Sequence, residues 1–155
     1  MCGITGFWDL NKKRSKDLDV NIKNMTDCLY NRGPDDKGLW VDKKNCIAFG
    51  HRRLSILELT KLGKQPMFSK NKRFVISYNG EIYNYLEIKE ELKKKGKYFK
   101  SNCDTEVLIE SIDSWGIEKT LNKIAGMFSF AVWDNKNKKL YLARDRLGIK
   151  PLYWS

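Results

Sequence analysis

The last third of the chain carries the pattern that constrains the fold most. Residues 126–145 read GMFSFAVWDNKNKKLYLARD and predict two strands joined by a polar turn at 135–138. Strands linked by so short a turn must be antiparallel. Further strands are predicted at 2–9, 37–42, 46–57 and 73–84, and the last of these begins as a strand and breaks at Asn79-Gly80.

Amphipathic helices are predicted between the strands. They span 17–33, 84–96 and 104–116, and Gly and Lys mark 58–72 as a loop. The expected apolar faces are Val20, Met25, Cys28 and Leu29 on the first helix, Tyr85, Ile88 and Leu92 on the second, and Leu108, Ile112 and Trp115 on the third. Short strands in hairpin-like order with helices between them predict an α+β fold with largely antiparallel sheets.

Length and composition favour one folded domain. The chain has 155 residues, of which 41% are hydrophobic, and this is enough for a sizeable core. No apolar run approaches the ~20 residues that span a bilayer, and Asp9 interrupts the short N-terminal apolar run. We therefore expect a cytoplasmic protein with no membrane partner.

The net charge of +11 raises the question of an acidic partner such as nucleic acid. The excess is mostly lysine, in clusters that are not interleaved with aromatic residues, and arginine, which suits bidentate phosphate contacts, is sparse. We predict that the clusters at 12–13, 43–44, 93–95 and 136–139 are solvated faces, and we rank nucleic-acid binding below this interpretation.

The four cysteines do not indicate a metal site. They show no C-x-x-C spacing, and His51 is the single histidine. We expect no metal, and we expect Cys28 and Cys46 to be small buried hydrophobic residues. His51 lies in an apolar strand, which favours a hydrogen-bonded core residue over the base of a cysteine–histidine pair.

Cys2 has two interpretations. If Met1 is removed, one residue carries both a thiol and a free α-amine, whose pKa of ~7.7–8.0 suits a general base near neutral pH. Gly3 then permits close approach of a substrate. The alternative is an ordinary buried cysteine on the first strand, and Cys2 alone favours that alternative.

Three other short stretches also have a purely structural interpretation when taken singly, and for Asn79-Gly80 and Asp104 we favour it. Asn79-Gly80 is first a turn signal, but an Asn amide beside a Gly N–H also forms a pair of donors that suits an oxyanion. An arginine in the apolar stretch 50–56 suits a substrate carboxylate or one of the chain's own acids. Asp104 is well placed as a helix N-cap.

Taken together and in this order, the stretches are specific. The chain resembles the class II glutamine amidotransferase domain, the N-terminal-nucleophile glutaminase, most closely the form found in glutamine-hydrolysing asparagine synthetases. The stretches that carry the resemblance cover essentially the whole chain and read MCGITGFWD, NRGPDDKG, GHRRLSI, QPM, NGEIYNY, CDTEVLIESIDSWG, AGMFSFAVWD and ARDRLGIKPLYW.

The resemblance implies a role for particular residues. Cys2 is the nucleophile, and its α-amine is the base once Met1 is removed. Asn79 and Gly80 form the oxyanion hole. The expected substrate-binding residues are Arg53 at the α-carboxylate, the backbone around Leu54, Ser55, Ile56 and Leu57, the oxyanion pair Asn79 and Gly80, and Glu81 and Asp104 at the α-ammonium.

The same resemblance implies a four-layer αββα sandwich over residues 1–155, a γ-glutamyl thioester, and ammonia passed to a synthetase that amidates aspartate. The partners are then L-glutamine and a synthetase domain or subunit. No SGGxDS stretch is present, so ATP and magnesium belong to a synthetase domain and no cofactor is expected here. We also expect the domain to be truncated at its C-terminal end. The alternatives are a glutaminase for another ammonia acceptor and a non-catalytic glutamine- or partner-binding module.

Overall fold

The computed structural model describes residues 2–11, 17–55, 58 and 60–155. Within these, the elements in chain order are β1 (Gly3–Trp8), α1 (Leu18–Asp27), β2 (Asp36–Asp42), β3 (Ile47–Arg53), β4 (Met67–Phe68), β5 (Phe74–Ile82), α2 (Tyr85–Lys94), α3 (Asp104–Trp115), α4 (Ile117–Lys123), β6 (Gly126–Asp134) and β7 (Lys139–Arg144). Two single-turn 3₁₀ helices lie at Tyr30–Arg32 and Lys61–Gly63.

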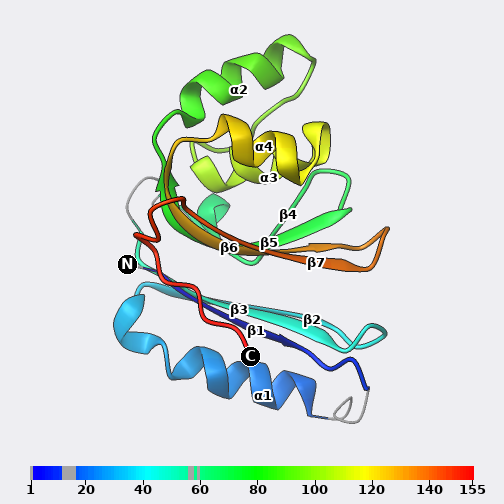
Figure 1. Ribbon diagram of the computed structural model, residues 1–155. Coiled ribbons are helices and arrows are strands. Elements are labelled where there is room, and N and C mark those ends of the chain that lie inside the picture. Colours follow the sequence, from blue (N-terminus) through cyan, green and yellow to red (C-terminus); the bar gives the residue numbers. More distant parts are fainter. Residues whose placement is uncertain (1, 12–16, 56–57, 59) are drawn as a thin grey trace.

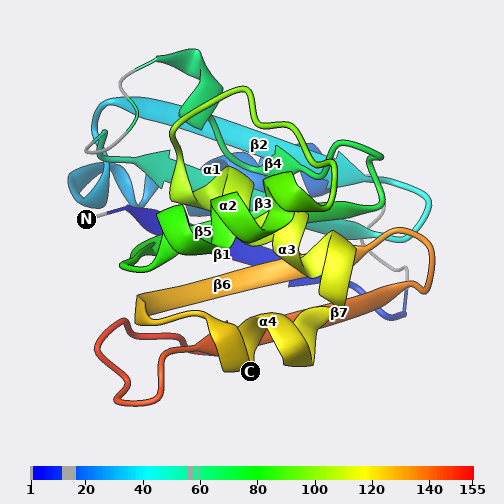
Figure 2. The ribbon, with the colours of Figure 1, turned by 90° about the horizontal axis from the view of Figure 1, so that it is seen from above.

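The strands form two antiparallel sheets that face each other. The first has the order β1-β3-β2 and the second the order β4-β5-β6-β7. Helix α1 covers the outer face of the first sheet, and α2, α3 and α4 lie on the outer face of the second (Figure 1). The view from above shows α3 between α2 and α4, with α4 on the side of β7 (Figure 2). The expected four-layer αββα sandwich is confirmed.

Alternation along the strands divides the core into two parts. In β5 and β6, Ile76, Phe128 and Phe130 face the helices and pack with Ile109 of α3. The residues between them face the first sheet, where Val75 and Trp133 pack against Phe49 and its neighbours. The part of the core between the two sheets also contains a polar contact. There, Ser77 Oγ of β5 donates to the Gly50 carbonyl of β3 at 3.2 Å.

The buried face of α1 differs from the prediction. The structure buries Leu18, Ile22 and Thr26, whereas Val20 is 59% exposed and Met25 is also exposed. The reason lies in the sheet beneath the helix. A Cβ atom at Gly50 of β3 would lie 1.9 Å from Thr26 Oγ1, so the missing side chain leaves room for the threonine and sets how the helix lies on the strands.

The predicted first helix is also too long. It ends at Asp27, and the chain turns through the 3₁₀ helix, which is closed by bonds from Arg32 N to Leu29 O and from Gly33 N to Tyr30 O. The turn brings the chain back toward β2, beside β3. Cys28 therefore lies at the turn and is exposed, so its prediction as a core residue is wrong, whereas Cys46 is buried as expected.

The predicted break at Asn79-Gly80 is wrong as well. Strand β5 runs through both residues to Ile82, paired with β6 along its whole length. Gly80 lies opposite Phe128, and a Cβ atom on it would be 2.4 Å from the Met127 carbonyl oxygen. The glycine therefore permits a close approach of two strands, where the dipeptide suggested a turn.

The remaining elements follow the predictions with small differences. The hairpin at 126–145 and the second and third helices are confirmed, while α4 and the short strand β4 were not predicted. The lysines at 43–44, 93–95 and 136–139 are exposed as expected, and 12–13 lie outside the described residues. No helix in the described part of the chain is long and apolar enough to cross a membrane.

Candidate functional site

The register of the two sheets brings the predicted residues to one end of the sandwich. Cys2 immediately precedes β1, and β1 pairs with β3 so that Gly3 lies opposite Arg52. Arg53 ends β3 at the same place. Strand β5 ends at this end too, near the N-terminus (Figure 1). Residues far apart in the sequence therefore meet between the sheets.

A cavity of about 220 Å³ lies there. Most of the predicted site residues line it, namely Cys2, Arg53, Leu54, Asn79, Gly80, Glu81 and Asp104. Ser55 is not among its lining residues, and its backbone N–H donates instead to Asp35 Oδ2 at 2.7 Å. Ile56 and Leu57 lie outside the described residues.

The thiol of Cys2 is held against the end of β3. The Leu54 N–H donates to Cys2 Sγ at 3.4 Å, and the Leu54 carbonyl lies 3.6 Å from the same sulfur. Arg32 Nε donates to the Cys2 carbonyl at 3.2 Å. These contacts fix the direction of the side chain at the cavity wall, so a nucleophile at this position would be oriented before substrate arrives.

Arg53 is buried and is oriented by its neighbours. Its Nη1 donates to the Thr60 carbonyl at 2.8 Å, and Gly63 lies so close that a Cβ atom there would be 2.3 Å from Nη2. The neighbouring Arg52 forms an ion pair with Asp27, so the expected pairing with one of the chain's own acids occurs at Arg52. The guanidinium of Arg53 thus keeps donors for an anion in the cavity.

Strand β5 presents an edge to the cavity beyond its pairing with β4. The Tyr78 N–H donates to Gln65 Oε1 at 2.7 Å, and the Ile82 N–H donates to Asp104 Oδ2 at 3.0 Å. Because the N–H groups of alternate strand residues point to the same edge, the Gly80 N–H points between these two bonds. This is the position expected of a backbone oxyanion donor.

The side chain of Asn79 points to the other face of β5. It alternates with Tyr78, which packs among the core residues on the helix side, and it is 5% exposed. Its amide therefore lies between the sheets, on the face that carries Cys2 and Arg53. The two donors predicted for an oxyanion are adjacent in the sequence and reach the same cavity.

Asp104 is not the N-cap of α3, because that position is held by Cys103. It is the first helical residue, and its Oδ2 accepts from the Tyr78 hydroxyl at 2.6 Å as well as from Ile82. Burial raises the pKa of Asp104 above its ordinary value, and the hydrogen bond from Tyr78 and that from Ile82 oppose the shift. Burial and the neighbouring carboxylate also raise the pKa of Tyr78, so its hydroxyl remains a donor.

His51 is a buried structural residue, as predicted. It is 1% exposed, and its Nε2 lies 3.0 Å from the Tyr78 carbonyl. Burial lowers its pKa to about 4, so the ring is neutral at physiological pH. It is not among the residues that line the cavity.

Sequence reasoning missed several residues of the cavity wall, namely Glu58, Gly63, Gln65, Tyr78, Cys103, Thr105, Met127 and Lys150. Five of them, Gln65, Cys103, Thr105, Met127 and Lys150, lie in stretches that carried the resemblance, but no role had been assigned to them. Lys150 and Arg53 are cations in the wall, and Glu58, Glu81 and Asp104 are anions there. The cavity therefore offers both signs of charge to a small ligand.

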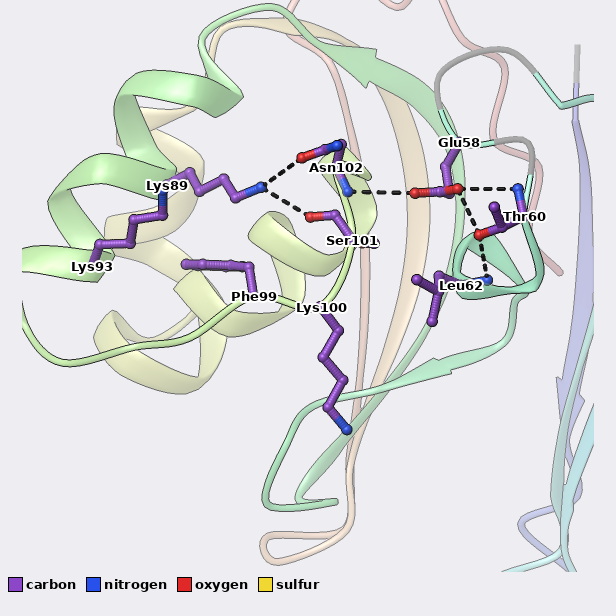
Figure 3. A pocket seen from close by; sticks show the side chains of 9 residues that line it. All are labelled: Glu58, Thr60, Leu62, Lys89, Lys93, Phe99, Lys100, Ser101 and Asn102. Atoms are coloured by element: carbon purple, nitrogen blue, oxygen red, sulfur yellow. Dashed lines mark hydrogen bonds between the residues drawn. The ribbon is translucent and has the colours of Figure 1, made fainter.

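A second cavity of about 430 Å³ lies between α2, the loop before α3 and the segment that contains Glu58 (Figure 3). Its lysines are partly engaged, since Lys89 Nζ donates to Ser101 O at 2.9 Å and to Asn102 Oδ1 at 3.2 Å. Glu58 lines both cavities, and its carboxylate accepts from Thr60 and Asn102. Among the residues that the structure describes, no thiol lines this second cavity, whereas Cys2 lines the smaller one, which is therefore the candidate for chemistry.

Comparison with known proteins decides the family. A family model described as the glutamine amidotransferase domain matches residues 1–155. The chain belongs to the glutamine amidotransferase domain family. This amidotransferase domain also superposes on the glutamine phosphoribosylpyrophosphate amidotransferase from Bacillus subtilis, with a TM-score of 0.71 and 19% identity over 97% of this chain and 38% of that one. The two share the fold.

Curated relatives match this amidotransferase domain over the full length of the given chain. It is 41% identical to "Asparagine synthetase [glutamine-hydrolyzing] 3" and 42% identical to "Asparagine synthetase [glutamine-hydrolyzing] 2", both from Bacillus subtilis. These matches cover 100% of this chain and 25% and 20% of the relatives. "Amidase chry2" of Gibberella zeae is 34% identical, over 100% of this chain and 24% of its own length. The chain thus spans a quarter or less of these relatives.

Proposed function

We propose that this amidotransferase domain hydrolyses L-glutamine to glutamate and ammonia, with Cys2 as the nucleophile. The observation that carries the proposal is the meeting of Cys2, Arg53, Asn79 and Gly80 at one cavity between the sheets. These residues come from three different strands or strand ends. Family membership supports the same activity.

The cavity matches the three polar groups of free glutamine. In the proposed complex, Arg53 binds the α-carboxylate through two parallel hydrogen bonds. Glu81 and Asp104 receive the α-ammonium, and the side-chain amide extends toward Cys2. The backbone of Leu54 borders the same path, since both its N–H and its carbonyl lie beside the Cys2 sulfur.

The proposed reaction proceeds through a γ-glutamyl thioester. The α-amine of Cys2, free after removal of Met1, takes the thiol proton, and the sulfur attacks the amide carbon. The carbonyl oxygen becomes an oxyanion that accepts from the Asn79 amide and the Gly80 N–H. When the C–N bond breaks, the protonated α-amine gives its proton to the departing ammonia. Water then attacks the thioester, and glutamate leaves as the thiol is restored.

We further propose that the ammonia serves an asparagine-synthetase-type amidation of aspartate by a synthetase domain or subunit. Two of the relatives above bear the asparagine synthetase name over the full length of this chain, which supports this acceptor. A longer protein that carries this domain should form asparagine from aspartate, ATP and glutamine. Formation of a different amide in that assay would replace aspartate as the acceptor.

The activity is tested by glutamate release from L-glutamine after mass spectrometry has confirmed that Met1 is absent. We expect turnover by the unaltered chain and none by Cys2→Ala. Cys28→Ala is the matched control, because this thiol is exposed and does not line the cavity. Turnover that persists in Cys2→Ala would refute the assigned nucleophile. Absence of turnover in well-folded, Met1-free protein would favour the binding-module alternative.

A further inference from the structure

The carboxylate of Asp104 is held by a hydroxyl group to which the proposed function assigns no role. Tyr78 Oη donates to Asp104 Oδ2 at 2.6 Å, and both residues are at least 95% buried. The ring of Tyr78 packs with the core residues between β5 and the helices, so it approaches the carboxylate from behind. Tyr78 thus has its ring in the hydrophobic core and its hydroxyl on a carboxylate of the cavity wall.

The backbone of Tyr78 is fixed by a second set of contacts. Its N–H donates to Gln65 Oε1 at 2.7 Å, and Gln65 Nε2 donates in turn to Thr105 Oγ1 at 3.4 Å. The Tyr78 carbonyl lies 3.0 Å from His51 Nε2. Tyr78 is therefore held at its N–H, its carbonyl and its hydroxyl, and its hydroxyl position is well determined.

We propose that Tyr78 is a positioning residue for substrate recognition, which holds Asp104 ionised and in place to receive the α-ammonium of glutamine. A buried carboxylate needs hydrogen-bond donors to stay charged. Asp104 has two for Oδ2, the Tyr78 hydroxyl and the Ile82 N–H. The proposal rests on the function proposed above, because Asp104 must be an ammonium-binding residue for Tyr78 to act through it.

Removal of the Tyr78 hydroxyl should make the Asp104 carboxylate easier to protonate. Burial already raises the pKa of Asp104, and the Tyr78 hydroxyl is the first of the hydrogen bonds that lower it. Without that bond the pKa rises further, so the carboxylate takes up a proton at a higher pH and loses its attraction for an ammonium group. The charged and titratable groups that face Asp104 or share its cavity remain in Tyr78→Phe, namely Cys2, Arg53, Glu58, Glu81, Cys103 and Lys150.

The test compares two ligands that differ only in the ammonium group. Binding of L-glutamine and of glutaric acid monoamide, which lacks the α-ammonium, is measured by calorimetry on the Met1-free chain with Cys2→Ala, so that no turnover occurs. Adding Tyr78→Phe should weaken glutamine binding about tenfold, the scale of one hydrogen bond to a charged group. Binding of the monoamide should stay the same.

The pH dependence supplies a second readout. Glutamine binding should weaken as pH falls through the pKa of Asp104, and in Tyr78→Phe this loss should begin at a higher pH. Tyr85→Phe is the matched control, because Tyr85 packs against the same core from α2 and does not line the cavity. It should leave both ligands and the pH profile unaltered.

Three other results of these binding measurements are possible, and each would refute a particular part of the proposal. If Tyr78→Phe weakens both ligands equally, the residue acts through general structure and the proposed positioning role is wrong. If Asp104→Asn abolishes the preference for glutamine while Tyr78→Phe leaves it intact, only the role of Tyr78 fails. If Asp104→Asn leaves the preference intact, the ammonium site of the proposed function fails, and the inference fails with it.

Discussion

Replacing Gly80 with alanine tests whether the close approach of β5 and β6 sets the oxyanion hole. A Cβ atom at Gly80 would lie 2.4 Å from the Met127 carbonyl oxygen, 2.7 Å from Phe128 Cα and 2.8 Å from Phe128 Cβ. Ordinary contacts begin near 3.4 Å. Two of the three atoms belong to the backbone, so the strands themselves must separate by about 1 Å, since a shift of side chains does not relieve the overlap.

That shift should affect stability and activity by different amounts. Overpacking of this kind costs about 1–3 kcal/mol of unfolding free energy. A displacement of about 1 Å at a catalytic group costs on the order of 10²-fold in rate, because the Gly80 N–H no longer meets the oxyanion. We therefore expect kcat for glutamate release to fall about 100-fold, with a smaller change in KM, since the groups that bind the α-carboxylate and the α-ammonium remain.

The assay is steady-state glutamate release at a temperature where circular dichroism shows the variant folded, with urea unfolding measured in parallel. Gly6→Ala is the control, because its Cβ would lie 2.8 Å from the Ala48 carbonyl oxygen between β1 and β3 and Gly6 does not line the cavity. It should lose stability and keep its kcat. An unaltered kcat in Gly80→Ala, or an equal loss in both variants, would refute the reasoning.

Three further predictions follow from the site. Asn79→Ala should lower kcat by about 10²–10³-fold, because one oxyanion donor is lost, and glutamate release at an unaltered rate would contradict this role. Gly63→Ala should displace the Arg53 guanidinium, whose Nη2 would lie 2.3 Å from the new Cβ, and should raise KM for glutamine about tenfold with little effect on kcat, as steady-state kinetics will show. Burial lowers the pKa of His51 from 6.5 to about 4, so the unfolded chain takes up this proton first, and the unfolding free energy should fall by roughly 3 kcal/mol between pH 7 and pH 4. Urea unfolding at both pH values should show this loss in the unaltered chain and a smaller loss in His51→Asn, and equal losses would disprove it.

Local patterns in the sequence predicted the elements whose own residues determine them. The hairpin at 126–145 has two apolar runs and a polar turn, and the structure forms it with β6 and β7. The helices α2 and α3 likewise bury the expected faces, with Ile88 and Leu92 on one and Leu108 and Ile112 on the other. In these cases periodicity and burial select the same conformation.

Predictions failed where a distant strand decides the local conformation. Asn79-Gly80 has the composition of a turn, but it pairs with β6, and only the neighbouring backbone shows why a glycine is needed there. The face of α1 that is buried depends on Gly50, which lies 24 residues beyond Thr26 and contacts it. A local stretch of the sequence reveals neither contact, because the two partners lie far apart along the chain.

The sequence by itself determined the fold class and named seven of the fifteen residues that line the cavity, through a series of motifs spread from Cys2 to Asp104. What only the tertiary structure decided is how those residues are held. Gln65 accepts from the Tyr78 N–H at the edge of β5, and Asp104 accepts from the Tyr78 hydroxyl, through bonds that cross 13 and 26 residues of chain. Such contacts form because α3 and the segment before β4 pack against β5, and hydrogen bonds over that range depend on packing and not on local propensity.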